Sequence, residues 1–122
     1  GNTALMMASH KGHKEIVEIL FKVEGINVNI VSYYGNTALM MASHKGHKEV
    51  VQMLLNFEGI NVNATDKDGN TALMMASHKG HNEIVEILID DGRINENDVL
   101  KRVYLCMCLI ILIFLFTGKI NS

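Results

Sequence analysis

Cysteine is scarce in this chain, and its scarcity excludes several classes of protein. The two cysteines, Cys106 and Cys108, stand two residues apart inside one apolar run. At that spacing their side chains point to different sides of a helix or along the same face of a strand, and neither arrangement favours a mutual disulfide. Because no other cysteine is present, the sequence carries no disulfide framework and no cysteine-based zinc site. We therefore expect a reducing compartment.

An excess of charge of either sign is also missing. The 122 residues include 11 Lys and Arg against 13 Asp and Glu, for a formal net charge of -2. Nucleic-acid binding needs a basic face, so this balance argues against such a partner. Hydrophobic residues make up 48% of the chain, which is enough for a packed core in one domain. No secretory signal pattern opens the chain, and because Gly1 falls inside a motif we expect the native N-terminus upstream.

Motifs that would carry catalysis or cofactor binding are lacking. The sequence has no phosphate-cradling glycine-rich loop of the P-loop kind. Ser9 and His10 are neighbours in sequence, which is not the geometry of a nucleophile and its base. The six histidines form His-x-x-His pairs, but no nearby Cys or carboxylate completes a tetrahedral metal site: His10/His13, His44/His47 and His78/His81. We predict no enzyme activity, no cofactor and no metal site.

What the sequence does contain is an internal repeat. The run Gly-Asn-Thr-Ala-Leu-Met-Met-Ala-Ser-His-Lys-Gly-His begins at Gly1, Gly35 and Gly69, so the period is 34 residues. Each unit predicts a helix, a turn, a second helix and an extended hairpin. One such unit cannot bury its own apolar face, and about three stacked units are needed for stability. We therefore expect an array over residues 1–98, with units 1–34, 35–68 and 69–98, and a tail over 99–122.

Local signals set the helix boundaries within a unit, and they recur in each copy. In the first unit, Thr3 is the expected N-cap before five good helix formers. Gly12 follows that helix where a left-handed backbone is needed. A second helix should run from about 13 to 22 and end at Gly25 in the same way, as its equivalent should at Gly59. Its buried stripe is predicted to be Ile16, Val17, Leu20 and Phe21.

These residues resemble the ankyrin repeat. The motif of that family runs Gly-x-Thr-Pro-Leu-His-x-Ala-Ala-x-x-Gly-His, followed by a Val/Ile-Val pair and a Leu-Leu pair. The second unit matches it in order and spacing at Gly35, Thr37, Leu39, Ala42, Gly46, His47, Val50, Val51, Leu54 and Leu55. The other units match likewise, over roughly residues 1–98. The resemblance implies an all-α solenoid of helix-turn-helix units with short hairpin loops that binds another protein.

Three departures from the family's motif bear on the packing, and the second unit shows each of them. Ala38 replaces the motif's proline, which removes a pre-set backbone angle but keeps good helix propensity. Met40 replaces the motif's histidine, so we expect the polar tie from that histidine to the threonine to be absent and the core to be looser. The period is one residue longer than usual, and the extra residue should lie between the second helix and Gly59.

The resemblance also implies where a partner binds. Ankyrin arrays present a concave surface made by the hairpin tips and the inner helices. The family's variable contact positions fall on Asn2, His10 and Lys11 in the first unit, on Tyr33, Tyr34, Asn36, His44 and Lys45 in the second, and on Lys67, Asp68, Asn70, His78 and Lys79 in the third. None of these residues is needed for the apolar stripe. The sequence does not give the identity of the partner.

Tyr33 and Tyr34 stand out on this surface. Tyrosine is enriched at interface hot spots, and the pair sits on an otherwise polar tip. The alternative is that both side chains simply pack on the neighbouring hairpin. The repeated Ser-His-Lys carries less weight, because duplication copies whatever residues were there.

The repeat pattern stops near Asp98, and an apolar tail follows. Lys101 and Arg102 precede the run from Val103 to Thr117, which is apolar all round with no helical stripe. As a membrane-anchoring helix this run would span only about 22 Å of the roughly 30 Å of hydrocarbon, with the flanking cations extending its reach. The run could instead cap the third unit, with one apolar face exposed to water. A third alternative is that the tail is not native coding sequence. An anchor would leave the repeats in the cytoplasm, where we place the protein in any case.

Overall fold

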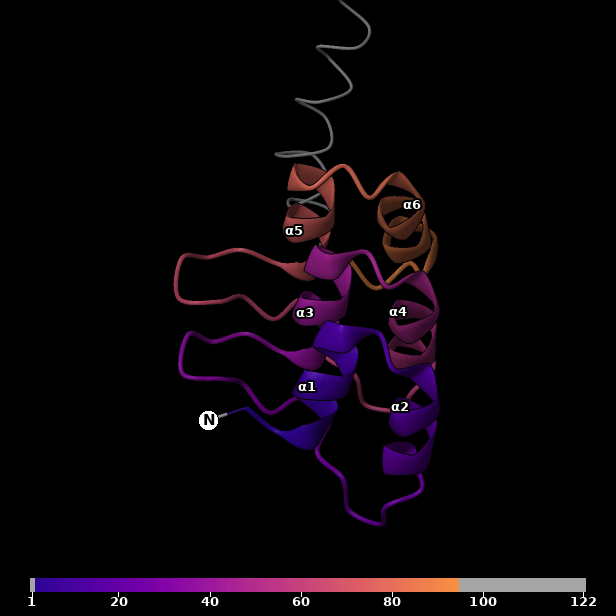
Figure 1. Ribbon diagram of the computed structural model, residues 1–122. Coiled ribbons are helices and arrows are strands. Elements are labelled where there is room, and N and C mark those ends of the chain that lie inside the picture. Colours follow the sequence, from indigo (N-terminus) through magenta and orange to yellow (C-terminus); the bar gives the residue numbers. More distant parts are fainter. Residues whose placement is uncertain (1, 95–122) are drawn as a thin grey trace, which may run out of the picture.

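A computed structural model describes residues 2–94 of the chain as three stacked units, each with an inner and an outer helix. The inner helices α1, α3 and α5 pack side by side in one layer, and the outer helices α2, α4 and α6 form a second layer (Figure 1). The loops between units project to one side of the inner layer (Figure 1). No strand occurs within residues 2–94, so the all-α prediction is confirmed there. The helices are α1 (Ala4–Lys11), α2 (Lys14–Phe21), α3 (Ala38–Lys45), α4 (Lys48–Leu55), α5 (Ala72–His78) and α6 (Asn82–Asp90).

Each inner helix begins after a threonine N-cap, as predicted. The Thr37 hydroxyl accepts the backbone N–H of Met40 at 3.2 Å, and Thr3 and Thr71 make the same bond in their units. The Met40 sulfur in turn accepts the Thr37 N–H at 3.4 Å, and Met6 does so for Thr3. The motif's histidine tie is not available here, and in the first two units this sulfur bond to the threonine backbone takes its place, which was not predicted from the sequence. A thioether is a weak acceptor, but it reaches the same N–H that a capping-box side chain would.

Glycines mark the turns inside each unit. Gly46 caps α3 with a left-handed backbone (φ 80°), as predicted for this position. The prediction that Gly25 and Gly59 end the outer helices was wrong. Those helices end at Phe21 and Leu55, and the residues that cap them keep a right-handed backbone. The two glycines, also at positive φ, belong to a separate turn further along the chain.

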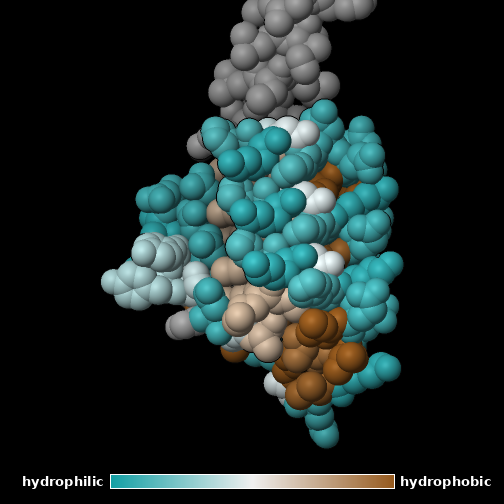
Figure 2. Space-filling model, viewed as in Figure 1, coloured by the Kyte–Doolittle hydropathy of each residue, from teal (hydrophilic) through white to brown (hydrophobic). Residues whose placement is uncertain are grey.

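The hydrophobic core lies between the two layers and is most complete in the middle unit. All four stripe residues of α4 are buried: Val50, Val51, Leu54 and Leu55. In α2, by contrast, Val17 is buried, but Leu20 and Phe21 are half-buried and Ile16 is 45% exposed. The prediction of a fully buried stripe was therefore wrong for the first unit, because no described helix covers its outer side. Figure 2 shows the resulting apolar patch over that end of the array.

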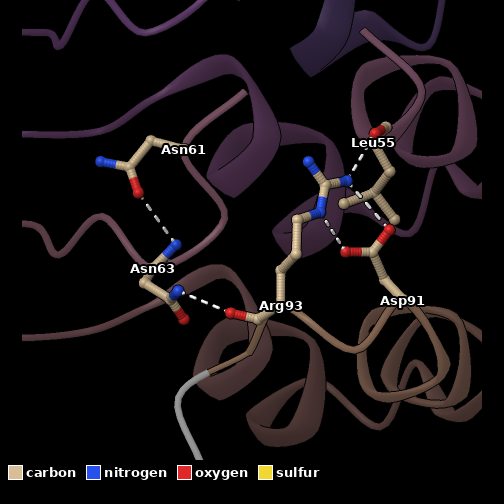
Figure 3. Close-up of polar contacts among 5 residues, drawn as sticks. All are labelled: Leu55, Asn61, Asn63, Asp91 and Arg93. Atoms are coloured by element: carbon tan, nitrogen blue, oxygen red, sulfur yellow. Dashed lines mark hydrogen bonds and ion pairs between the residues drawn. The ribbon is translucent and has the colours of Figure 1, made fainter. Parts of the chain in front are cut away.

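Polar side chains tie the loops of neighbouring units together. The Asn29 amide donates to a carbonyl of the next unit at 2.8 Å, and the Asn63 amide donates to the carbonyl of Arg93, also at 2.8 Å (Figure 3). The Arg93 guanidinium donates to the Leu55 carbonyl and pairs with Asp91, both at 2.6 Å (Figure 3). The third unit departs from the repeat sequence here, yet these contacts hold it to the second.

The C-terminal part of the sequence-based prediction lies outside the described residues. This applies to the predicted apolar helix, to the run from Val103 to Thr117 and to the array boundary at residue 98. Within residues 2–94, every helix is too short or too polar to cross a membrane.

Candidate protein-binding surface

Two adjoining hollows run along the inner helices. One, of about 480 Å³, lies between the second and third units, and the other, of about 330 Å³, lies between the first and second. Asn36, Met41 and His44 line both, so the two hollows form one concave surface across the array. We call this surface the inner groove. Each inner helix contributes two neighbouring methionines and one histidine to its lining, and the second methionine and the histidine of each helix are Met7 and His10, Met41 and His44, and Met75 and His78.

The predicted contact residues divide between this groove and its surroundings. Those that line the inner groove are Asn2, His10, Asn36, His44, Lys45, Asn70 and His78. Those that lie outside it, on the loop tips or at the ends of inner helices, are Lys11, Tyr33, Tyr34, Lys67, Asp68 and Lys79. Met41 and its equivalents were missed as surface residues. The sequence held a signal for them, because they occupy an unspecified position of the repeat motif rather than a core position.

The two tyrosines occupy the tip of the loop between α2 and α3. Tyr33 is 73% exposed and Tyr34 68%, and their rings meet edge to face with centroids 5.3 Å apart. The Lys67 ammonium lies 3.9 Å from the centre of the Tyr33 ring, and the Lys67 N–H donates to the Tyr34 carbonyl at 3.1 Å. The neighbouring loop therefore holds the pair from one side by a cation–π contact and a backbone bond. Most of both rings stays open to solvent.

In the second and third units, the second histidine of the pair connects the unit to the one before it. The His47 Nε2 lies 2.9 Å from the His10 carbonyl, and the His81 Nε2 lies 3.1 Å from the His44 carbonyl. A carbonyl only accepts, so each ring carries its hydrogen on Nε2. The His47 ring also fits closely over Gly12, where an added Cβ would stand 2.6 Å from its Nδ1. These histidines hold the units in register, and among residues 2–94 no cluster of three metal-ligating side chains of the His, Cys, Asp and Glu kinds occurs.

The first histidine of each pair faces a different environment, next to lysine. Desolvation lowers the pKa of His10, and the positive charges of Lys45 and Lys11 lower it further. The pKa of His44 is lowered in the same way by desolvation and then by Lys79 and Lys45. Both imidazoles are therefore neutral at pH 7. In each case the lysine of the following unit lies near enough for its charge to act on the histidine.

Comparison with known families agrees with this architecture. A family model described as "Ankyrin repeats (3 copies)" matches residues 1–66, and one described as "Ankyrin repeats (many copies)" matches residues 54–99. Together the two matches span the stretch that the internal repeat predicts as the array. No curated protein matches the chain.

Proposed function

The chain belongs to the ankyrin-repeat family, and from this premise we propose that it is a scaffold that binds a partner protein on the inner groove and the adjoining loop tips. Ankyrin repeats generally mediate protein–protein contacts and are generally not enzymes. The observation that carries the proposal is the tyrosine pair, which offers large aromatic surface to solvent beside an open groove.

The way the pair is held favours binding. Two large side chains fixed against each other and against Lys67 have already lost much of their rotamer freedom. A partner that covers them therefore gains apolar contact at a small further cost in conformational entropy. Tyrosine also has a hydroxyl that can bond a polar group at the rim of an interface.

The first test removes both aromatic rings. We expect Tyr33→Ala with Tyr34→Ala to weaken the partner's affinity at least about tenfold, the scale of interface hot spots. Circular dichroism and the melting temperature should stay nearly unchanged, because more than half of each side chain is exposed. The partner would be captured from extract with the tagged full-length chain, and its affinity for each variant would be measured by calorimetry.

A matched control removes comparable exposed apolar surface elsewhere. Ile19 and Val23, 62% and 51% exposed, lie on the outer side of the first unit. Their replacement by alanine should leave affinity unchanged. If the tyrosine variant loses folding and binding together, the rings are structural; if the control weakens binding equally, the partner sits on the outer side.

We also propose that the array works in the cytoplasm, and a second candidate function is that of a membrane-tethered scaffold. The apolar run from Val103 to Thr117 favours this candidate. Lys101 and Arg102 before the run outnumber Lys119 after it, which would keep the array on the cytoplasmic side. The competing interpretations remain a cap on the third unit and a tail that is not native coding sequence.

An arginine in the middle of the run separates these interpretations. We expect Ile111→Arg to move the full-length chain from the membrane pellet to the supernatant in alkaline carbonate extraction, because a central arginine opposes insertion of a short span. The chain would carry a fluorescent tag before Gly1. Ile111→Leu, which keeps the apolar character, serves as the control and should stay in the pellet. If the parent chain and the arginine variant were both found in the supernatant, the membrane anchor would be ruled out.

A further inference from the structure

Charge is divided unevenly between the two helix layers. The inner helices contain no Asp or Glu, and each ends at or beside a lysine. These three lysines occupy the same position of each unit, are all exposed, and are called here the lysine row: Lys11, Lys45 and Lys79. The carboxylates of the helices lie instead on the outer layer: Glu15, Glu18, Glu49, Glu83, Glu86 and Asp90. Lys45 lines the inner groove, and Lys11 and Lys79 lie at the ends of the inner helices on either side of it, so these helix ends are cationic although the whole chain has a net charge of -2.

We infer that the inner groove and the helix ends beside it take an acidic, extended segment of the partner, with one carboxylate for each lysine of the row. The inference rests on the proposed scaffold function and names the chemistry of its partner. Opposite charges across an interface favour encounter, register and the choice of partner.

The spacing of the array favours an extended segment. The inner helices of successive units pack against each other, and packed helices lie about 8–10 Å apart. A polyproline II segment has three residues per turn and advances about 9 Å in that turn. A carboxylate at every third residue would therefore face one lysine of the row in each successive unit.

The floor of the inner groove suits the residues between those carboxylates. Met7 is 58% exposed, and Met41 and Met75 are half-buried at the equivalent positions. Thioether side chains are flexible and polarizable, so they adapt to apolar side chains of varied shape. Asn36 lines both hollows and offers an amide that can bond the unpaired backbone of an extended segment.

One carboxylate among the described residues does line the groove, and its charge is already engaged. Asp66 accepts the backbone N–H of Asp68 at 2.9 Å and of Asn70 at 2.8 Å. These bonds stabilise its own loop and draw the carboxylate toward it. Asp66 therefore opposes an acidic partner less than a free carboxylate would.

A nucleic-acid strand is the competing polyanion, and the charge density argues against it. One strand of DNA has one charge for about every 3.4 Å of the helix axis, whereas the lysine row has one cation for about every 9 Å. His10 and His44 add no charge at neutral pH, because their pKa values are lowered. The row matches sparse carboxylates better than closely spaced phosphates.

The test uses a labelled peptide of repeated Glu-Pro-Pro triplets and the full-length chain, with binding followed by fluorescence anisotropy. We expect this peptide to bind at least about tenfold more tightly than the same peptide with glutamine for glutamate, the scale for several exposed charge pairs together. It should also bind more tightly than a peptide of the same composition with its glutamates contiguous. Added salt should weaken its binding.

Two lysine variants of equal net charge locate the site. Lys11→Gln with Lys45→Gln and Lys79→Gln should lose about tenfold in peptide affinity. Lys14→Gln with Lys22→Gln and Lys48→Gln, on the outer layer, should lose little. Circular dichroism verifies that both variants fold.

Several results would overturn the acidic partner. They are equal binding of the glutamine peptide, equal loss in the two lysine variants, or tighter binding of a single-stranded oligonucleotide. Failure of the scaffold function looks different. A chain that captures a partner through Tyr33 and Tyr34, regardless of the lysine row, remains a scaffold and has no acidic ligand. A chain that binds the acidic peptide through the row but captures no protein keeps the charged site and loses the scaffold function.

Discussion

Replacing Leu54 by alanine is expected to lower the free energy of unfolding by about 2–5 kcal/mol, the range for leucine truncation in a packed core. Leu54 is fully buried in α4, in the unit with described neighbours on both sides. Native domains have a total stability of only about 5–15 kcal/mol, so this loss is a large fraction of it. Urea unfolding of the full-length chain, followed by circular dichroism, measures the change.

Leu20→Ala is the matched control for this prediction. Leu20 holds the same position of the repeat in α2, but there it is only half-buried. Truncation should therefore cost clearly less at Leu20 than at Leu54, because less surface leaves water when the protein folds. If the two losses were equal, the outer side of the first unit would be as well packed in solution as the middle of the array, contrary to the structure.

The second large effect is expected at a glycine. Gly46→Ala should cost about 2–3 kcal/mol, from two separate causes. A left-handed backbone (φ 80°) disfavours any side chain by about 1–2 kcal/mol. The added Cβ would also lie 2.8 Å from Cε1 of His81, so the ring must move and weaken its bond to the His44 carbonyl, which contributes about 1 kcal/mol.

Gly80→Ala separates these two causes. Gly80 has nearly the same backbone angle (φ 75°), but no described atom lies within 4 Å of its Cβ position. Gly80→Ala should therefore cost only the free energy of placing a side chain on a left-handed backbone. Thermal or urea unfolding should show a smaller loss of stability for Gly80→Ala than for Gly46→Ala. In a His81→Ala background the cost of Gly46→Ala should fall to that of Gly80→Ala. An unchanged cost in that background would mean that the histidine ring does not hold the units together.

The helices were predictable because their determinants are local. A threonine followed by strong helix formers and then a glycine sets the start and end of each inner helix within one unit. Thr37 and Gly46 perform these roles as expected. The motif residues inside each unit pointed to the family, and the period predicted stacked units, because stacking buries the apolar faces of such units.

The exposure of an apolar side chain was not predictable from the sequence of a single unit, because it depends on which neighbouring unit packs against that side chain. Ile16 and Val50 hold equivalent positions, yet Ile16 is 45% exposed and Val50 is 1% exposed. The sulfur bond of Met40 was missed for a different reason: a weak acceptor is effective here only because the helix start places it against the Thr37 N–H.

The sequence predicted many residues of the candidate site, but it did not predict which of them lie together. Lys67 and Tyr33, which are in contact, hold equivalent positions of adjacent units. The residue one period of 34 after Tyr33 was therefore the neighbour to expect. Only the structure shows which of the predicted contact residues line the inner groove and which lie on the loop tips. This division depends on how far each loop projects beyond the inner helices (Figure 1).

Among the described residues no helix covers the face of the first unit that points away from the second, and this face has the residues to receive a further unit. Ile16 stands there where Val50 stands on the buried side of the second unit, so the surface already has the chemistry of an internal junction. A duplicated module inserted ahead of the first unit would cover this side and present a new one of the same kind. An ankyrin protein of this type can therefore grow by gene duplication without redesign of any junction, and each module adds one lysine to the row.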